Sequence, residues 1–145
     1  MNVADKFYFD TSALLPYYRN EANSLEVQRF LLEVPPPVLI SRLTRVEFAS
    51  AIARWVRMNE LTEAEASLIE NAFSDDIKAG LYIVQSVSTS HFNQAEKWIS
   101  SKRSSLRTLD ALHLACSWSS NAELITCDKT LYQSASKLGL SSHFI

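Results

Sequence analysis

The sequence contains very little glycine. Average usage of roughly 7% would place about 10 glycines in a chain of this length, whereas the 145 residues include two, Gly80 and Gly139. Two isolated glycines cannot form a Walker phosphate-binding loop or the G-x-G-x-x-G turn of dinucleotide-binding folds, because both need several glycines at close spacing. The sequence therefore excludes nucleotide binding through either of these loops.

Cysteine and histidine are also scarce. Cys116 and Cys127 are too far apart for a C-x-x-C pair, and the three histidines are scattered along the chain. The sequence therefore contains no Cys/His zinc motif. With so few cysteines we expect a reducing, cytoplasmic setting.

No long apolar run is present. The longest segment without Asp, Glu, Lys or Arg, residues 79–95, is rich in Ser, Gln and Asn and is too polar to cross a membrane. The short apolar run between Asp5 and Asp10 does not form a signal peptide, and residues 1–5 read as a short extension before the first strand. We expect no export and no membrane anchor.

Five short apolar runs alternate with amphipathic patterns. The runs have the length of buried strands and fall at Phe7–Phe9, Val38–Ile40, Leu81–Val84, Leu124–Thr126 and His143–Ile145. Helical patterns occupy Leu25–Val34, Leu43–Met58, a segment that a capping box opens at Thr62, and segments centred on Ala95, Leu112 and Ala135. Strands separated by helices predict a mostly parallel sheet covered on both faces. With 47% hydrophobic and 21% charged residues, we expect one α/β domain over residues 1–145.

Four acidic residues lie at the carboxyl edge of this predicted sheet. Asp10 ends the first strand, and Glu47 lies early in the helix after the second. Asp110 opens a helix, and Asp128 follows the fourth strand. Ligands of open parallel sheets bind outside the carboxyl ends of the strands. These four acids are therefore the candidate functional residues.

Each acid also has a purely structural explanation. Asp128 fits an N-cap, Asp110 fits a first-turn acid that complements the helix dipole, and Asp10 fits a turn acid. Glu47 lies in a mostly apolar helix, so its charge needs a partner, for which arginines of the same helix are candidates. Taken together, these explanations require four independent coincidences.

Convergence of the four acids would require a counter-ion. Two carboxylates about 4 Å apart repel each other by about 4 kcal/mol at an effective dielectric constant near 20. Oxygen ligands without a Cys or His set favour a hard cation, Mg²⁺ or Mn²⁺. Metal-assisted hydrolysis of a phosphodiester is the reaction that such a site serves.

The positive charge is concentrated in two stretches. Residues 42–57 carry four Arg against Glu47, a balance of +3, and residues 97–107 carry four basic residues and no acid, a balance of +4. Since the whole chain has a net charge of −2, the remainder carries −9. Basic stretches on both sides of an acidic site suit an anionic polymer, although each stretch also fits an ordinary solvated helix face.

The motifs resemble those of the PIN-domain ribonucleases, most closely the VapC-type toxins of bacterial toxin–antitoxin pairs. The family's first motif, an apolar strand followed by Asp-Thr/Ser-Ser, falls on Asp10–Ser12, and its helical Glu falls on Glu47. Its Asp-Ala-Leu-His-Leu-Ala helix start falls on Asp110–Ala115, and its Thr-x-Asp falls on Thr126–Asp128. The motifs keep the family's order over residues 6–145.

The resemblance implies a PIN-like three-layer fold and Mg²⁺- or Mn²⁺-dependent endonucleolytic cleavage of RNA. Water would be the nucleophile, and the products would carry 5′-phosphate and 3′-hydroxyl ends. The implied metal ligands, direct or through water, are Asp10, Glu47, Asp110 and Asp128, with Ser12 and Thr126 orienting the carboxylates or the substrate. The resemblance also implies a homodimer, a small antitoxin whose tail fills the active-site groove, and transfer RNA as a family-based suggestion for the substrate.

Other readings of the motifs are less consistent with the sequence. A haloacid-dehalogenase phosphatase needs a second Asp where Ser12 stands, and a response-regulator receiver needs an Asp where the third strand ends in Gln85. A di-iron site would need a second acid-x-x-His helix beside Asp110 and His113, and none is present, so we interpret His113 as a packed or hydrogen-bonded helix residue. The main alternative is a non-catalytic PIN-like module that binds RNA or a partner.

Overall fold

The chain folds into alternating strands and helices. The computed structural model describes residues 6–145, and the expected N-terminal extension, residues 1–5, lies outside the described residues. The elements are β1 (Phe7–Phe9), α1 (Thr11–Tyr18), α2 (Ser24–Glu33), β2 (Val38–Ser41), α3 (Arg42–Arg57), α4 (Glu63–Lys78), β3 (Tyr82–Gln85), α5 (Thr89–Ser100), α6 (Thr108–Ser119), β4 (Glu123–Thr126), α7 (Lys129–Lys137) and β5 (Ser142–Phe144).

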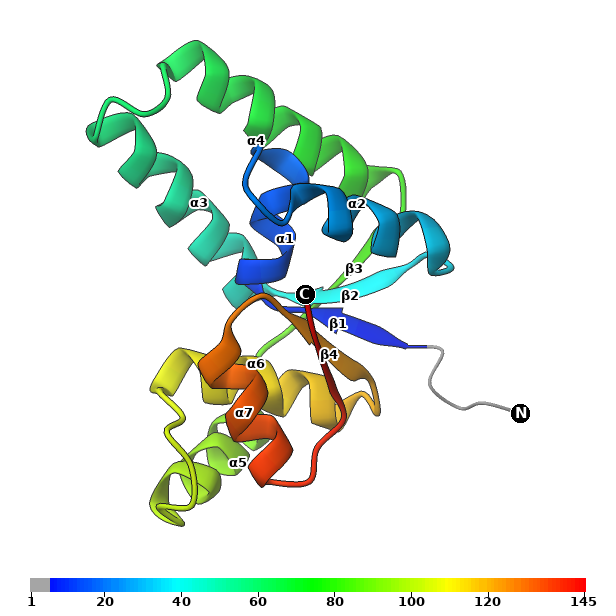
Figure 1. Ribbon diagram of the computed structural model, residues 1–145, viewed down its shortest axis with the longest axis vertical. Helices are drawn as coiled ribbons and strands as arrows, with labels where there is room; N and C mark the ends of the chain where they lie inside the picture. Colours follow the sequence, from blue (N-terminus) through cyan, green and yellow to red (C-terminus); the bar gives the residue numbers. More distant parts are fainter. Residues whose placement is uncertain (1–5) are drawn as a thin grey trace.

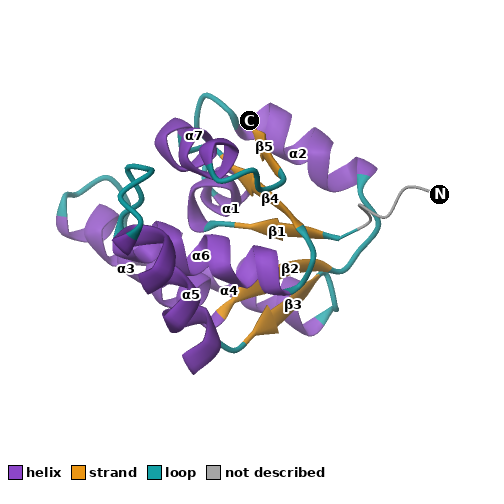
Figure 2. Cartoon of the chain, turned by 90° about the horizontal axis from the view of Figure 1, so that it is seen from below, coloured by secondary structure: helices purple, strands orange, loops and turns teal. Residues whose placement is uncertain are grey.

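All five strands form one parallel sheet in the order β3-β2-β1-β4-β5. In the register, Tyr8 of β1 lies beside Leu39 of β2 and Leu124 of β4. Helices α1 to α4 cover one face of the sheet and α5 to α7 the other, as Figures 1 and 2 show. The predicted α/β fold with a central parallel sheet between two helical layers is therefore confirmed.

Neighbouring residues of each inner strand pack into different halves of the core. Tyr8 and Leu124 contribute to the cluster beneath α6 and α7, whereas Phe9 and Ile125 contribute to the cluster beneath α1 and α3. Successive side chains of a strand point to opposite faces, and here both faces are covered. This is why the strands read as continuous apolar runs.

The order of connections creates a topological switch point between β1 and β4. From β1 the chain moves outward to β2 and β3, then returns to β4 beside β1 and moves outward to β5. The helix after β1 lies on one face of the sheet and the helix after β4 on the other, so the two connections diverge. Ligand sites of open α/β sheets lie at such a switch point. Asp10 and Asp128 follow the two strands that border it.

Helix α1 was not anticipated from the sequence. It contains Pro16, which is unfavourable beyond the first turn of a helix because it lacks the N–H that would bond to the preceding turn. The burial of Ala13, Leu14 and Pro16 against the core offsets that loss. The remaining differences are shifts of one residue in strand ends, such as β3 at Tyr82–Gln85.

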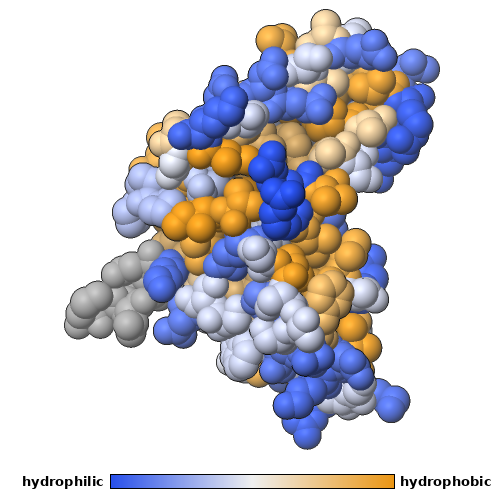
Figure 3. Space-filling view, turned by 180° about the vertical axis from the view of Figure 1, so that it is seen from behind, coloured by the Kyte–Doolittle hydropathy of each residue, from blue (hydrophilic) through white to orange (hydrophobic). Residues whose placement is uncertain are grey.

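The α3–α4 hairpin extends well beyond the sheet (Figure 1). Its side chains Val46, Met58 and Leu68 are apolar and exposed. Figure 3 shows that apolar areas also lie between polar areas on the face seen from behind. Within residues 6–145, no helix combines the length and the apolar character that a membrane span requires.

Candidate metal centre

Asp10 lies at the end of β1 and caps α1. Its carboxylate accepts hydrogen bonds from Ser12 Oγ (2.8 Å), Thr126 Oγ1 (2.7 Å) and the backbone N–H of Ala13 (3.1 Å). The residue is 3% exposed. Burial raises the pKa of this carboxyl, against the lowering effects of the His113 charge and of the hydrogen bonds from Thr126 and Ser12. Asp10 is therefore a buried acid whose charge is incompletely compensated.

The hydroxyls of Ser12 and Thr126 join the ends of β1 and β4. Their oxygens lie 3.1 Å apart, and Ser12 Oγ also accepts from the backbone N–H of Cys127 at 3.0 Å. Thr126 Oγ1 accepts from the backbone N–H of Asp128 at 3.0 Å while it donates to Asp10. Both hydroxyls thus lie where they fix the orientation of Asp10 and of the start of α7.

Glu47 extends from α3 into a network with α1 and α6. Its Oε1 accepts from Thr11 Oγ1 at 2.6 Å and lies 2.5 Å from His113 Nε2. On the other side of the ring, His113 Nδ1 lies 2.7 Å from the Tyr8 hydroxyl, which donates to Ser41 Oγ at 2.9 Å. Burial acts to raise the pKa of Glu47, but the hydrogen bond and charge of His113 and the hydrogen bond of Thr11 lower it overall.

Asp110 and Asp128 share one arginine. Arg107 Nε lies 3.3 Å from Asp110 Oδ2, and Arg107 Nη2 lies 3.4 Å from Asp128 Oδ2. Asp128 also caps α7, because its Oδ1 accepts from the backbone N–H groups of Thr130 (2.9 Å) and Leu131 (3.3 Å). Burial, and next the charge of Asp128, raise the pKa of Asp110, while Arg107 lowers it.

The acids form three groups near the carboxyl ends of β1 and β4. Asp10 groups with Ser12 and Thr126, Glu47 groups with His113, and Asp110 groups with Asp128 through Arg107. Thr126 connects the first group to the third through the backbone of Asp128. Over residues 6–145, no three Asp, Glu, His or Cys side chains are already gathered closely enough to hold one ion.

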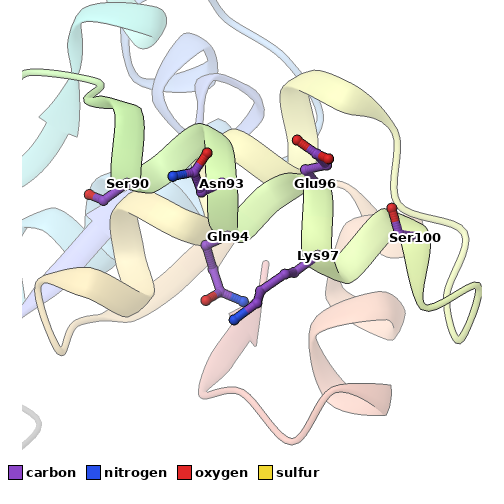
Figure 4. A pocket seen from close by; sticks show the side chains of 6 residues that line it. All are labelled: Ser90, Asn93, Gln94, Glu96, Lys97 and Ser100. Carbon is purple, nitrogen blue, oxygen red and sulfur yellow. The ribbon is translucent and has the colours of Figure 1, made fainter.

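An open pocket of about 410 Å³ lies beside these groups, lined by Glu47, Arg107, Thr108, Leu109 and Asp110. A somewhat larger hollow of about 480 Å³ lies on α5 instead. Figure 4 shows that the side chains lining that hollow leave a single helix in different directions, so they do not converge on a ligand. The pocket that Glu47 and Asp110 line is the candidate site, because of the two it is the one beside the acids.

The donor set fits a hard divalent cation. The acids offer only carboxylate oxygens, which are the ligands that Mg²⁺ and Mn²⁺ prefer. Burial raises the pKa values of Asp10 and Asp110, so their charged forms lack the compensation that a nearby cation provides. A positive group, the guanidinium of Arg107, already lies against two of the acids.

Thr11, His113 and Arg107 take part in the site but were not among its predicted residues. The partner of Glu47 is His113 together with Thr11, not an arginine of α3. His113 is hydrogen-bonded inside the fold, as interpreted, and its position one helical turn after Asp110 places both on the same side of α6. Arg107 was counted only within a basic stretch; its spacing of three residues before Asp110 is the signal for the ion pair.

Comparisons with known proteins agree with this architecture. The family model described as PIN domain matches residues 7–137. FitAcB from Neisseria gonorrhoeae aligns over 96% of both chains with a TM-score of 0.74 and 14% identity. VapC20 from Mycobacterium tuberculosis, a sarcin-ricin loop cleaving toxin, aligns over 89% of this chain and 95% of its own with a TM-score of 0.67 and 16% identity. A toxin–antitoxin complex from Klebsiella pneumoniae aligns over 86% of this chain and 89% of its own, with a TM-score of 0.62 and 20% identity.

At these identities the solved structures show a shared fold. No curated protein matches this sequence.

Proposed function

The chain belongs to the PIN domain family, and from this premise we propose that it is a metal-dependent endoribonuclease that acts as the toxin of a type II toxin–antitoxin pair. The observation that supports the proposal is that Asp10, Glu47, Asp110 and Asp128 belong to hydrogen-bonded and ion-paired groups beside the switch point of a parallel sheet. Such an accumulation of carboxylates costs folding free energy unless a cation binds there. The raised pKa values of Asp10 and Asp110 support a functional site over separate helix caps.

The acids would hold Mg²⁺ or Mn²⁺ directly or through water. When bound, such a cation supplies Lewis-acid stabilisation of the phosphoryl oxygens and activates the attacking water. The chain's own residues prepare the site for it. Thr126 and Ser12 fix the rotamer of Asp10, and His113 and Thr11 hold Glu47 in its charged form at the rim of the pocket.

The basic stretch at residues 97–107 supports RNA as the substrate. It forms the end of α5 and the loop to α6, and the loop ends at Arg107 beside the acids. Lys102, Arg103 and Arg107 are exposed. Cations along a surface that leads to an acidic site attract a phosphate backbone and bring a phosphodiester to it. Transfer RNA is one candidate substrate.

The proposed partners are a small antitoxin and a second copy of the chain. A toxin–antitoxin complex is among the structural neighbours, and the exposed apolar side chains of α3 and α4 provide surface for protein contacts. Both cysteines are free, which agrees with a reducing cytoplasmic location. These assignments belong to the same proposal.

Purified protein, freed of any copurifying partner, is incubated with total cellular RNA in Mg²⁺, in Mn²⁺ and in EDTA, and the new RNA ends are mapped. The key variant is Asp110→Asn, and the matched control is Asp75→Asn, the same chemical change at an exposed position of α4. We expect discrete metal-dependent cuts with 5′-phosphate ends for the wild type and the control, and none for Asp110→Asn.

Growth on induction provides a second readout. The wild type should arrest the host and Asp110→Asn should not. If wild-type protein retains RNA but cuts none under any of the metal conditions, the non-catalytic binding module is the correct description. Equal growth arrest by both proteins would mean that catalysis is not its cause.

A further inference from the structure

Arg107 occupies the oxygens that a cation would need. The guanidinium reaches Oδ2 of both Asp110 and Asp128, at 3.3 and 3.4 Å. The other oxygen of Asp128, Oδ1, is already engaged by two backbone N–H groups at the start of α7. Oδ2 is thus the oxygen of Asp128 left for a ligand, and it faces Arg107.

The three side chains differ sharply in their freedom to move. The side chain of Arg107 is 73% exposed, whereas those of Asp110 and Asp128 are 18% and 25% exposed. Asp128 is fixed by its capping bonds and Asp110 lies in the first turn of α6. When the two ion pairs break, we therefore expect the arginine side chain to move and the two carboxylates to stay in place. Room for that movement comes from the exposure of the Arg107 side chain itself.

A divalent cation and the guanidinium compete for these oxygens. Mg²⁺ binds carboxylate oxygens at about 2.0 to 2.1 Å and requires a near-octahedral shell. A guanidinium held against the same two oxygen atoms fills part of that shell and adds like-charge repulsion. Arg107 therefore opposes direct binding of the cation through these two oxygens.

We propose that Arg107 is a resident counter-ion of the metal centre: it holds Asp110 and Asp128 together in the metal-free protein and competes there with a divalent cation. This inference rests on the proposed metal-dependent function. It makes Arg107 a positioning residue that keeps the carboxylates in place at low metal concentration and lowers the affinity for the cation. Displacement leaves the guanidinium at the mouth of the pocket, on the side where the basic loop lies.

The test measures metal binding without RNA. Isothermal titration of Mn²⁺ and thermal melting in EDTA and in Mn²⁺ are carried out on the wild type, Arg107→Gln and Arg103→Gln. Arg103 is the matched control because it lies on the same loop, removes the same charge and forms no ion pair among residues 6–145. A double variant, Arg107→Gln with Asp128→Asn, removes the repulsion that the arginine relieves.

We expect Arg107→Gln to have a lower melting temperature in EDTA and a higher affinity for Mn²⁺ than the wild type. In EDTA, Arg107→Gln should melt below the wild type, and this deficit should shrink when Asp128→Asn is already present. The affinity of Arg107→Gln for Mn²⁺ should rise by about twofold to tenfold, the range that exposed ion pairs support. Arg103→Gln should match the wild type in both measurements.

An equal rise in affinity for both single variants would overturn the inference, because it would show a general effect of charge. The inference would also be overturned if Arg107→Gln and the wild type had the same melting temperature in EDTA. Absence of Mn²⁺ binding by the wild type would instead refute the proposed metal-dependent function, and the melting temperatures in EDTA would still decide whether Arg107 stabilises the two acids.

Discussion

His113 Nε2 lies 2.5 Å from Glu47 Oε1, which joins two helices across 66 positions of the sequence. A carboxylate has no hydrogen to give, so the imidazole donates in this contact. The ring is anchored on its other side by Tyr8. Glu47 is therefore held at the pocket by a chain of buried groups that begins in the central strand of the sheet.

Replacing His113 should weaken the fold and release Glu47. For His113→Leu we expect a loss of about 2 to 4 kcal/mol in the free energy of unfolding, because the Tyr8 hydroxyl and a partly buried carboxylate lose a partner. Urea denaturation measures this loss. His143→Leu, at an exposed histidine of β5, is the control and should change stability much less. Equal losses in the two variants would contradict the network.

The hydroxyl of Thr126 should contribute more to the free energy of unfolding than its methyl group. Thr126→Val keeps the shape but removes the donor to Asp10 and the acceptor for the Asp128 N–H, so we expect a cost of about 1 to 3 kcal/mol in urea denaturation. Thr126→Ser keeps both bonds and should be the milder change. If Ser and Val cost the same, packing rather than hydrogen bonding fixes this position.

Neutralising Asp110 should separate metal binding from stability. In EDTA, Asp110→Asn should melt at or slightly above the wild-type temperature, because the repulsion from Asp128 disappears while Arg107 keeps its contact with Asp128. The rise in melting temperature that Mn²⁺ gives the wild type should be lost. Clear destabilisation in EDTA would mean that Asp110 serves the helix start or the ion pair alone.

The stability of the metal-free protein should depend on pH through Asp10. Burial raises the pKa of Asp10 in the folded state, above the unfolded value of about 3.9. The folded state then holds the proton more tightly, so this group favours folding below the unfolded pKa and progressively less as pH rises through the folded pKa. The lowered pKa of Glu47 has the opposite effect on stability. Because Glu47 is present in both the wild type and Asp10→Asn, its contribution cancels in the difference between them.

We expect the melting temperature of the wild type minus that of Asp10→Asn, measured in EDTA, to decrease as pH rises from about 4 towards neutrality. A series of thermal melts across this range measures the difference. A difference that stays constant or grows would show that hydrogen bonds from Ser12 and Thr126 compensate the charge of Asp10 completely.

The sequence was sufficient to predict the sheet, since the inner strands are apolar on both faces and are recognisable by composition alone. Helix α1 was missed because Pro16 and an apolar surface all round remove the usual signals, and its stability comes from packing against distant residues. The partner of Glu47 could not be read from spacing either. His113 comes from another helix, and which helices face each other is decided by the tertiary fold.

Two of the four candidate acids cap helices with the same carboxylate that is proposed to bind the cation. Asp10 caps α1 and Asp128 caps α7. Asn is as good an N-cap as Asp, whereas Ala loses about 0.5 to 2 kcal/mol at such positions. If the proposed function holds, amide substitutions at these two positions should give an inactive form that still folds. Alanine scanning would confuse loss of chemistry with loss of a helix start.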